Sequence, residues 1–289
     1  MIARQKILIT GAKGQLGTEL GRLCTLFQMY NFVCLSKEEL SLDQPEQVRK
    51  AFEQERPDYC INCAAYTAVD KAESDVETAY KVNADGPGML AALCKEYKTR
   101  FIHISTDYVF DGTANVPYRE DDIALPQTVY GTSKLQGERQ AMEANKDTLV
   151  IRTSWVYSEY GKNFVKTMLR LINEKKEINV VNDQIGSPTY AGDLAETILH
   201  IIYSGKWIPG IYHYSNRGVI SWYDFVVAIS EIFGSNVKIN PISSAEYPTA
   251  AKRPAYSVLN TEKISKVYDV QIKYWKDSLR ACLSKMKSS

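Results

Sequence analysis

Short runs of apolar, mostly β-branched residues alternate with longer amphipathic segments through the first half of the chain. The apolar runs occupy residues 6–10, 31–35, 59–64, 100–105 and 148–153. Between them apolar residues recur at helical spacing, first at Leu16, Leu20, Leu23 and Phe27. Further helices are predicted at 45–54, at 75–97 with a bend near Pro87, and around Tyr130. Strands that alternate with helices in this way build a parallel sheet from βαβ units.

The second half of the chain has a looser pattern. Helical spacing predicts helices at 163–172, 191–203, 221–233 and 275–285. A short strand is predicted at 178–181. The run at 210–215 is predicted to be a strand that rejoins the sheet. We find no repeat and no low-complexity linker, so the second region should pack closely on the first. The pattern therefore predicts an α/β fold with a doubly wound parallel sheet and a smaller C-terminal lobe.

Composition and charge narrow the function classes. Of the 289 residues 45% are apolar and 24% are charged, and 35 basic residues face 34 acidic ones for a net charge of +1. This balance gives no electrostatic reason to expect a nucleic acid or an acidic membrane as partner. No apolar run approaches the ~18 residues that span a bilayer, and no signal peptide is visible. We therefore expect a cytoplasmic protein.

Cysteine and histidine spacing does not predict a metal site. Cys60 and Cys63 have the spacing of a redox or zinc pair, but they fall in a predicted strand, where residues three apart point to opposite faces. No second cysteine pair or nearby histidine completes a tetrahedral set. All six cysteines are expected to be free thiols.

A glycine-rich loop follows the first apolar run and opens the first helix. It comprises Gly11, Gly14, Gln15, Leu16 and Gly17. Glycine lets backbone amides approach a pyrophosphate with no Cβ in the way. The helix N-terminus adds oriented N–H groups and a partial positive charge. The loop predicts a Rossmann-type dinucleotide site.

The position of this loop predicts that the first part of the chain binds the coenzyme and the second part binds the substrate. Residues 1–154, rejoined by about 186–216, are predicted to bind the dinucleotide. Most of 155–289 is then left to form a substrate lobe. Ala64 and Ala65, at the end of the third predicted strand, are small enough for a coenzyme to lie against the backbone.

The residues after the second predicted strand bear on the choice of coenzyme. An acid there would bind the adenosine 2′-hydroxyl and repel a 2′-phosphate. The chain has Ser36 and Lys37 instead, which tolerate or attract the phosphate. We expect NADPH to be used at least as well as NADH. Asp43 is equally compatible with an adenine contact and with a surface acid.

A phenol and an ammonium lie four residues apart at Tyr130 and Lys134, on one face of a predicted helix. A fixed cation lowers the pKa of a phenol toward neutral pH, where acid–base catalysis is most effective. Thr106, at the tip of the fourth predicted strand, can donate a hydrogen bond to a substrate oxygen or can cap the next turn together with Asp107. Together with the phosphate loop, these groups predict a carbonyl reductase or alcohol dehydrogenase.

Several segments together resemble the extended short-chain dehydrogenase/reductase superfamily and, within it, the dTDP-4-dehydrorhamnose reductases. They are the loop at 11–17, 62–73 (NCAAYTAVDKAE), 105–110 (STDYVF), 130–134 (YGTSK), 152–157 (RTSWVY), 182–189 (NDQIGSPT) and Arg253-Pro254. The resemblance implies reduction of the C4 ketone of dTDP-4-dehydro-L-rhamnose with NADPH or NADH. The partner would thus be a dTDP-linked 4-keto-6-deoxy sugar.

The resemblance also implies roles for individual residues. Tyr130 would be the proton donor, Lys134 its partner and Thr106 the group that polarises the carbonyl. Coenzyme contacts would come from Gly14, Gln15 and Leu16 at the phosphates and from Ala65, Tyr66 and Thr67 at the nicotinamide. The sugar would meet Thr106, Asp107 and Trp155. Arg253 would grip the diphosphate, unless it forms only a surface ion pair.

Alternatives remain open at this point. Epimerases, dehydratases and other 4-ketoreductases acting on nucleotide sugars use the same tyrosine. A dehydratase would place several acids directly after the polarising threonine. Here Thr106 is followed by one acid, Asp107, and then by Tyr108, which favours simple reduction. A non-catalytic NADP-binding regulatory subunit is the alternative from another class. Glu19 matches one part of a magnesium site at the dimer interface of some relatives, but no full ligand set aligns, so a monomer and a homodimer both remain possible.

Overall fold

The computed structural model describes residues 4–288. Its first half follows the predicted alternation of strands and helices. In chain order the elements are β1 (Gln5–Thr10), α1 (Gln15–Leu23), β2 (Tyr30–Leu35), α2 (Pro45–Glu55), β3 (Tyr59–Asn62), α3 (Val69–Ala72), α4 (Val76–Tyr80), η1 (Lys81–Asp85), α5 (Gly86–Tyr97), β4 (Arg100–Thr106), η2 (Asp107–Val109), α6 (Val129–Ala144) and β5 (Thr148–Thr153).

The second half has more short strands than the sequence predicted. Its elements are β6 (Val156–Tyr157), α7 (Phe164–Glu174), β7 (Glu177–Val181), β8 (Ile185–Gly186), β9 (Thr189–Tyr190), α8 (Ala191–Tyr203), β10 (Gly210–Tyr214), β11 (Ile220–Ser221), α9 (Trp222–Phe233), β12 (Lys238–Ile242), η3 (Ser244–Glu246), α10 (Glu262–Tyr268) and α11 (Trp275–Ser288). None of the helices in the described part of the chain is long and apolar enough to cross a membrane.

The main sheet of the described chain has six strands in the order β10-β5-β4-β3-β1-β2. Every neighbouring pair is parallel. The strand order changes direction between β1 and β3, and this switch point is where doubly wound sheets bind ligands. The predicted fold class is confirmed, and β10 rejoins the sheet beside β5, as its apolar run predicted.

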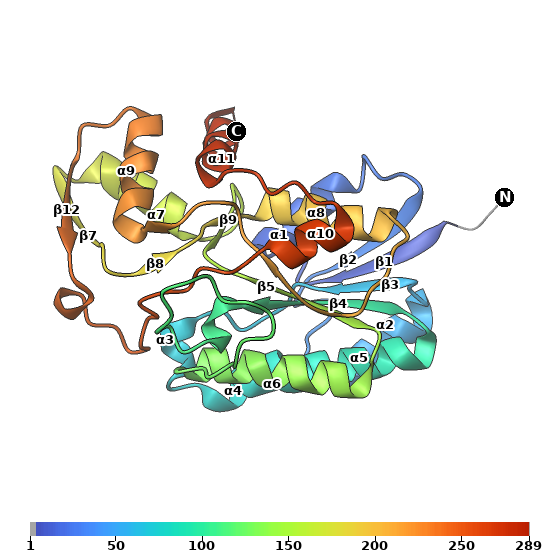
Figure 1. Ribbon diagram of the computed structural model, residues 1–289. Helices are drawn as coiled ribbons and strands as arrows, with labels where there is room; N and C mark the ends of the chain where they lie inside the picture. The colour runs from blue at the N-terminus through green and yellow to red at the C-terminus, as the bar shows by residue number, and fades with distance from the viewer. Residues whose placement is uncertain (1–3, 289) are drawn as a thin grey trace.

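Helices cover both faces of this sheet (Figure 1). On one face, α1 and α8 pack on the strands through buried side chains that include Leu20, Leu194 and Ile198. On the other face, α2, α5 and α6 do so through a second cluster that includes Phe52 and Leu90. Because both faces are buried, the strands are almost continuously apolar and do not alternate.

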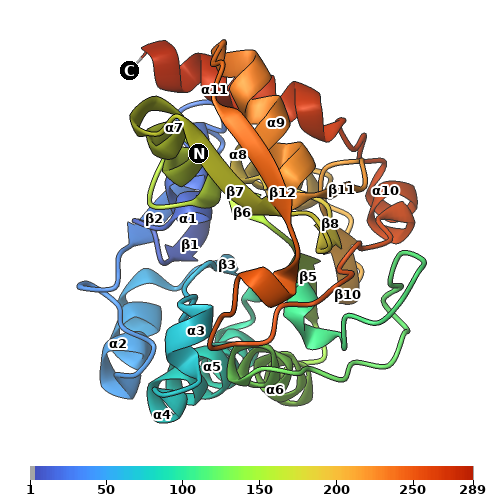
Figure 2. The same ribbon diagram turned by 90° about the vertical axis from the view of Figure 1, so that its left-hand side faces the viewer.

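The C-terminal lobe has its own core, formed mainly by α7, α9 and α11 with the parallel pair β7 and β12. Figure 2 shows the chain after β12 crossing from this lobe toward α3. The crossing is fixed where the Ala251 N–H donates to Asp70 Oδ1 at 3.0 Å. A segment far along the chain therefore closes over the carboxyl end of the sheet.

Several predicted boundaries were wrong. The third strand ends at Asn62 instead of residue 64, and Phe27 lies beyond α1, which ends at Leu23. The long helical segment predicted at 75–97 is confirmed from Val76 to Tyr97, and it contains the π-helical turn η1 just before Gly86 and Pro87. The pattern did not predict β12 or α10. All six cysteines are free thiols, as predicted.

Candidate active site

A cavity of about 520 Å³ lies at the carboxyl ends of β1 and β3, at the switch point of the sheet. Most of the predicted coenzyme residues line it. These are Gly11, Gly14, Gln15, Leu16, Lys37, Ala64, Ala65, Tyr66, Thr67, Tyr130 and Lys134. In the described part of the chain, Gly17, Ser36 and Asp43 lie outside its wall. The structure therefore brings the phosphate loop and the Tyr130–Lys134 pair to one cavity.

The phosphate loop leaves no room for a Cβ atom at two of its glycines. Gly11 has φ +65°, and a Cβ there would lie 2.7 Å from the Ala64 nitrogen. At Gly17 a Cβ would lie 2.4 Å from the Gly11 carbonyl oxygen. Helix α1 starts after Gly14 with no side-chain cap, so its first N–H groups remain available to an anion. This cradle fits a dinucleotide pyrophosphate.

Replacing Gly11 with alanine should therefore weaken coenzyme binding at least about tenfold. The left-handed backbone costs an L-residue roughly 1–2 kcal/mol, and the clash with Ala64 must also be relieved by moving the loop. Gly205 offers a matched control, because it has φ +68° but nothing within 4 Å of an added Cβ. Titration of tryptophan fluorescence with NADPH measures both variants. Equal affinity of Gly11→Ala and Gly205→Ala for NADPH would contradict the conclusion that the glycine loop holds the pyrophosphate.

Of the two residues predicted to lie near the adenosine ribose, Lys37 lines the cavity and Ser36 does not. Ser36 is buried at 2% exposure, and its N–H donates to the Glu39 carboxylate at 2.8 Å. Lys37 lines the cavity, but so does the acid Glu38, which pairs with Lys13 at 3.1 Å. Asp43 accepts a hydrogen bond from the Ser41 hydroxyl. The charged residues that line this end of the cavity are Lys13, Lys37 and Glu38.

The π-helical turn η1 holds the Tyr66 backbone at the cavity. Asn83 in this turn is buried, accepts from the Tyr66 N–H at 2.8 Å and donates to the Tyr66 carbonyl at 3.0 Å. It also donates to the Ser133 hydroxyl on α6. The sequence analysis missed Asn83. Its only local signal was the interrupted helix near Pro87, and π-turns often mark functional sites.

Tyr130 and Lys134 lie one turn apart on α6, and both line the cavity. The Lys134 side chain is buried, and its Nζ donates to the Ile104 carbonyl at 2.6 Å. Burial lowers the pKa of Lys134 to about 8. The predicted lowering of the Tyr130 pKa is wrong for the free chain, because burial of the phenol raises its pKa.

The hydroxyl of Thr106 lies close enough to Tyr130 to oppose that rise in the pKa of the phenol. Thr106 and Asp107 are both buried, at the end of β4 and in η2. Thr106 accepts from the Tyr108 N–H at 3.2 Å and donates to Asp107 Oδ1 at 3.0 Å. In the free chain Thr106 therefore caps the turn, and at the same time it lies beside the phenol.

Arg253 reaches this centre through Tyr108. The Tyr108 ring meets the Tyr130 ring edge to face, with 5.5 Å between centroids. Arg253 donates to the Tyr108 hydroxyl at 3.0 Å and forms an ion pair with Asp70 at 2.5 Å. The ion-pair alternative thus describes Arg253, which lines a hollow of about 160 Å³ and does not line the 520 Å³ cavity.

Trp155 has φ +49°, an unusual conformation for a bulky residue, directly after β5. Its ring stacks on Trp222 at 3.5 Å between centroids. An added Cβ at Gly186 would lie 2.5 Å from the Trp155 ring. Strained backbone of this kind persists where the surrounding structure enforces it, often at binding sites. Here the C-terminal lobe enforces it.

Comparison with known proteins identifies the family. A family model described as "RmlD substrate binding domain" matches residues 5–288. The chain belongs to the RmlD family. It is 43% identical to the spore coat polysaccharide biosynthesis protein SpsK of Bacillus subtilis, over 98% of this chain and 99% of that protein. It is 41% identical to a dTDP-4-dehydrorhamnose reductase of Aggregatibacter actinomycetemcomitans, over 95% of this chain and 97% of that protein.

Solved structures agree with this membership of the RmlD family. The crystal structure of a Bacillus anthracis dTDP-4-dehydrorhamnose reductase in complex with NADP aligns with a TM-score of 0.94 and 37% identity. The alignment covers 98% of this chain and 100% of that one.

Glu19 has other partners in this RmlD-family chain than a metal ion. It accepts from the Ser158 hydroxyl at 2.6 Å and lies 3.5 Å from Arg22. Burial, and the neighbouring Glu159, raise the pKa of Glu19 to about 7. Across residues 4–288, no three His, Cys, Asp or Glu side chains form a group that could hold a metal. Within one chain, Glu19 is therefore part of a hydrogen-bond network.

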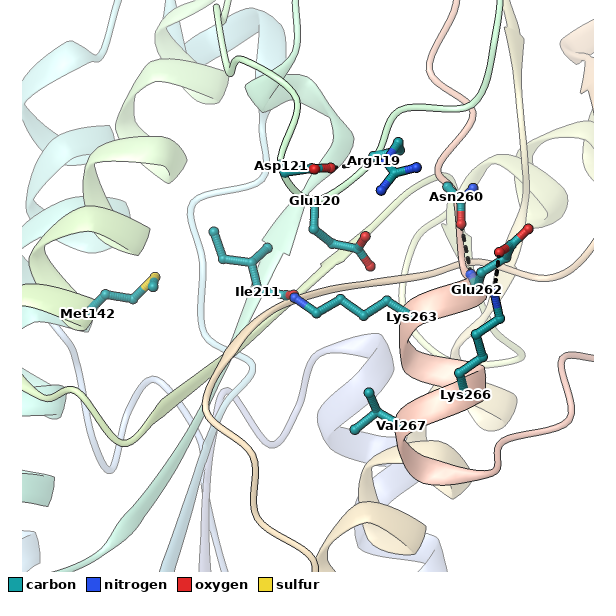
Figure 3. A pocket seen from close by; sticks show the side chains of 10 residues that line it. All are labelled: Arg119, Glu120, Asp121, Met142, Ile211, Asn260, Glu262, Lys263, Lys266 and Val267. Carbon is teal, nitrogen blue, oxygen red and sulfur yellow. Dashed lines mark hydrogen bonds and ion pairs between the residues drawn. The ribbon is translucent and has the colours of Figure 1, made fainter.

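A larger hollow of about 640 Å³ lies away from this site, beside β10 and α10. Figure 3 shows Lys263 extending across it toward Ile211, whose carbonyl accepts from Lys263 Nζ at 2.6 Å. Lys266 pairs with Glu262 there. None of the predicted site residues lines this hollow. Tyr130 and Lys134 line the other cavity.

Proposed function

We propose that this chain reduces the C4 ketone of dTDP-4-dehydro-L-rhamnose to dTDP-L-rhamnose with NADPH or NADH. The observation that carries the proposal is the convergence of Tyr130, Lys134 and the glycine cradle on one cavity. Relatives of 41% and 37% identity carry the name of this reductase, and the chain covers nearly their whole length.

The geometry of the site supports the following proposed roles. A nicotinamide coenzyme, when bound, would supply the hydride. Thr106 polarises the carbonyl oxygen and Tyr130 gives it a proton. Because the pKa of Tyr130 is raised, the phenol carries its proton at neutral pH and acts as an acid. Lys134, whose pKa is about 8, is placed to bond the ribose and to return a proton to the tyrosine.

Two further proposals concern the rest of the chain. Residues 1–154, rejoined by about 186–216, hold the coenzyme, and most of 155–289 binds the nucleotide sugar. In support, the cavity wall comes mainly from the first part, and the later chain adds Val156, Gly161, Lys162 and Leu194. Arg253 leaves Asp70 to grip the diphosphate, for which its planar fork is suited.

A coupled assay tests the function. dTDP-4-dehydrorhamnose is generated in situ, this protein and NADPH are added, and loss of absorbance by the reduced nicotinamide is followed. We expect consumption that depends on the sugar, with dTDP-L-rhamnose as product. An epimerase would keep NAD bound with no net consumption. A regulatory subunit would bind NADPH and reduce no nucleotide-linked 4-keto sugar.

We expect NADPH to be used at least as well as NADH, and Lys13 to control this preference. The Lys13–Glu38 pair neutralises an acid that would otherwise repel a 2′-phosphate. Lys13→Met should raise the KM for NADPH relative to NADH by roughly three- to tenfold, since both side chains are exposed and screened. Glu38→Gln should shift the ratio in the opposite direction. If the ratio of the KM for NADPH to the KM for NADH is the same in the wild type, Lys13→Met and Glu38→Gln, the Lys13–Glu38 pair does not control the choice of coenzyme.

A further inference from the structure

The hydroxyl of Thr106 has one proton, and in the free chain this proton is already engaged. Thr106 Oγ1 donates to Asp107 Oδ1 at 3.0 Å and accepts from the Tyr108 N–H at 3.2 Å. A threonine hydroxyl has a single donor and two lone pairs. While Asp107 is an ionised carboxylate, it can only accept, so Thr106 has no proton left for a substrate oxygen.

Asp107 is placed so that it can change its own role from acceptor to donor. The residue is 3% exposed, and its Oδ2 atom is buried with no hydrogen-bond partner among the described residues. A buried, half-satisfied carboxylate is costly, and protonation relieves the cost. Burial raises the pKa of Asp107 to about 6, although the neighbouring hydroxyls of Ser257 and Thr106 oppose the rise.

We propose that Asp107 is a positioning residue that sets the direction of the Thr106 hydrogen bond. When Asp107 carries a proton it donates to Thr106, and Thr106 donates in turn to the C4 carbonyl oxygen of the substrate. When Asp107 is ionised, Thr106 donates to it, and the carbonyl loses its polarising partner. The proposal rests on the ketoreductase function proposed above and adds a pH-sensitive control to it.

The two phenols and the ammonium near Asp107 have pKa values above that of the Asp107 carboxyl. Tyr108 on η2 and Tyr130 on α6 both have raised pKa values, mainly because they are buried. Lys134, also on α6, has a pKa of about 8. The chain after β12 contributes the Ser257 hydroxyl, which lies near Asp107. It also contributes Arg253, which donates to the Tyr108 hydroxyl and forms an ion pair with Asp70 of α3. A change in rate between pH 5 and 7 therefore reports on Asp107.

The direction in which kcat changes with pH follows from the role of Asp107 as a hydrogen-bond donor. The protonated form of Asp107 is the competent one, so kcat should be highest below the pKa of about 6 and should fall as pH rises through it. Above the pKa of Asp107, kcat should fall by about tenfold per pH unit. It should level off at the rate that Tyr130 supports without a hydrogen bond from Thr106 to the carbonyl. The KM for the sugar should change less than kcat.

The test compares kcat profiles from pH 5 to 7.5 at saturating NADPH. In Asp107→Asn the amide donates to Thr106 at every pH, so the profile should be flat across this range. In Ser257→Ala the carboxylate loses a donor that stabilises its charge, so the fall should move to higher pH. Glu19→Gln should keep the wild-type profile, although the Glu19 pKa is about 7, because Glu19 lies on α1 among Ser158, Arg22 and Glu159.

Three results would overturn the proposal. The first is a fall in kcat that persists in Asp107→Asn. The second is a wild-type rate that rises with pH, as expected if ionised Asp107 only accepts a sugar hydroxyl. The third is an unshifted profile in Ser257→Ala, which decides the matter if Asp107→Asn does not fold. A wild-type protein that reduces the keto sugar at no pH would instead refute the proposed function.

Discussion

Turnover should fall by a factor on the order of 10²–10⁴ when Tyr130 is replaced with phenylalanine, the usual loss for a general acid. The change removes one hydroxyl and leaves the ring, so its edge-to-face contact with Tyr108 and the fold of α6 are kept. NADPH should still bind, because the glycine cradle and Lys134 are intact. The coupled assay gives kcat, and fluorescence titration gives the coenzyme affinity.

Tyr108→Phe is the matched control, since it removes a phenolic hydroxyl from the ring next to Tyr130. That hydroxyl accepts from Arg253 at 3.0 Å and lies outside the Tyr130–Lys134 pair. Tyr108→Phe should therefore act mainly on the KM for the nucleotide sugar. Near-normal kcat in Tyr130→Phe, or an equal loss of kcat in both variants, would remove Tyr130 from its role as proton donor.

The sequence predicted those parts of the fold that depend on local patterns. Apolar runs bounded by helical spacing were enough for the parallel sheet, and the boundaries of β5 and α8 agree with the prediction to the residue. The phosphate loop was predictable for the same reason, because its glycines lie within seven residues of sequence, 11–17, that directly follow β1. Strand ends then placed Thr106 near Tyr130 without any knowledge of side-chain contacts.

Long-range contacts and burial explain what the sequence did not predict. The rise in the Tyr130 pKa comes from desolvation, which depends on segments that fold over the ring. Arg253 and Asp70 are 183 positions apart, so no local pattern could reveal their ion pair. Asn83, in the π-helical turn, accepts from the Tyr66 N–H 17 positions away in sequence, a contact that no local pattern reveals. The proton of Thr106 is directed by Asp107, its neighbour in sequence, yet only the buried geometry shows this.

An ion pair that the sequence analysis missed lies beneath the site. Arg152 on β5 and Glu138 on α6 are 3% and 2% exposed, with Nη2 and Oε2 2.7 Å apart. Arg152 Nε donates to Glu138 Oε1 at 2.9 Å, and the Ser105 hydroxyl donates to the same oxygen at 2.5 Å. The pair thus connects α6, which carries Tyr130 and Lys134, to the strands that end at Thr106 and Thr153.

Arg152→Met should lower the free energy of unfolding by about 3–5 kcal/mol, because Glu138 would remain buried with Ser105 as its main partner. Urea denaturation followed by circular dichroism measures the change. The double variant Arg152→Met, Glu138→Met should recover most of the loss, since apolar groups can replace a buried pair at little cost. Lys266→Met breaks the exposed pair with Glu262, so it should leave the free energy of unfolding nearly unchanged. If Arg152→Met were as mild as Lys266→Met, the buried pair would not be what holds α6 against the sheet.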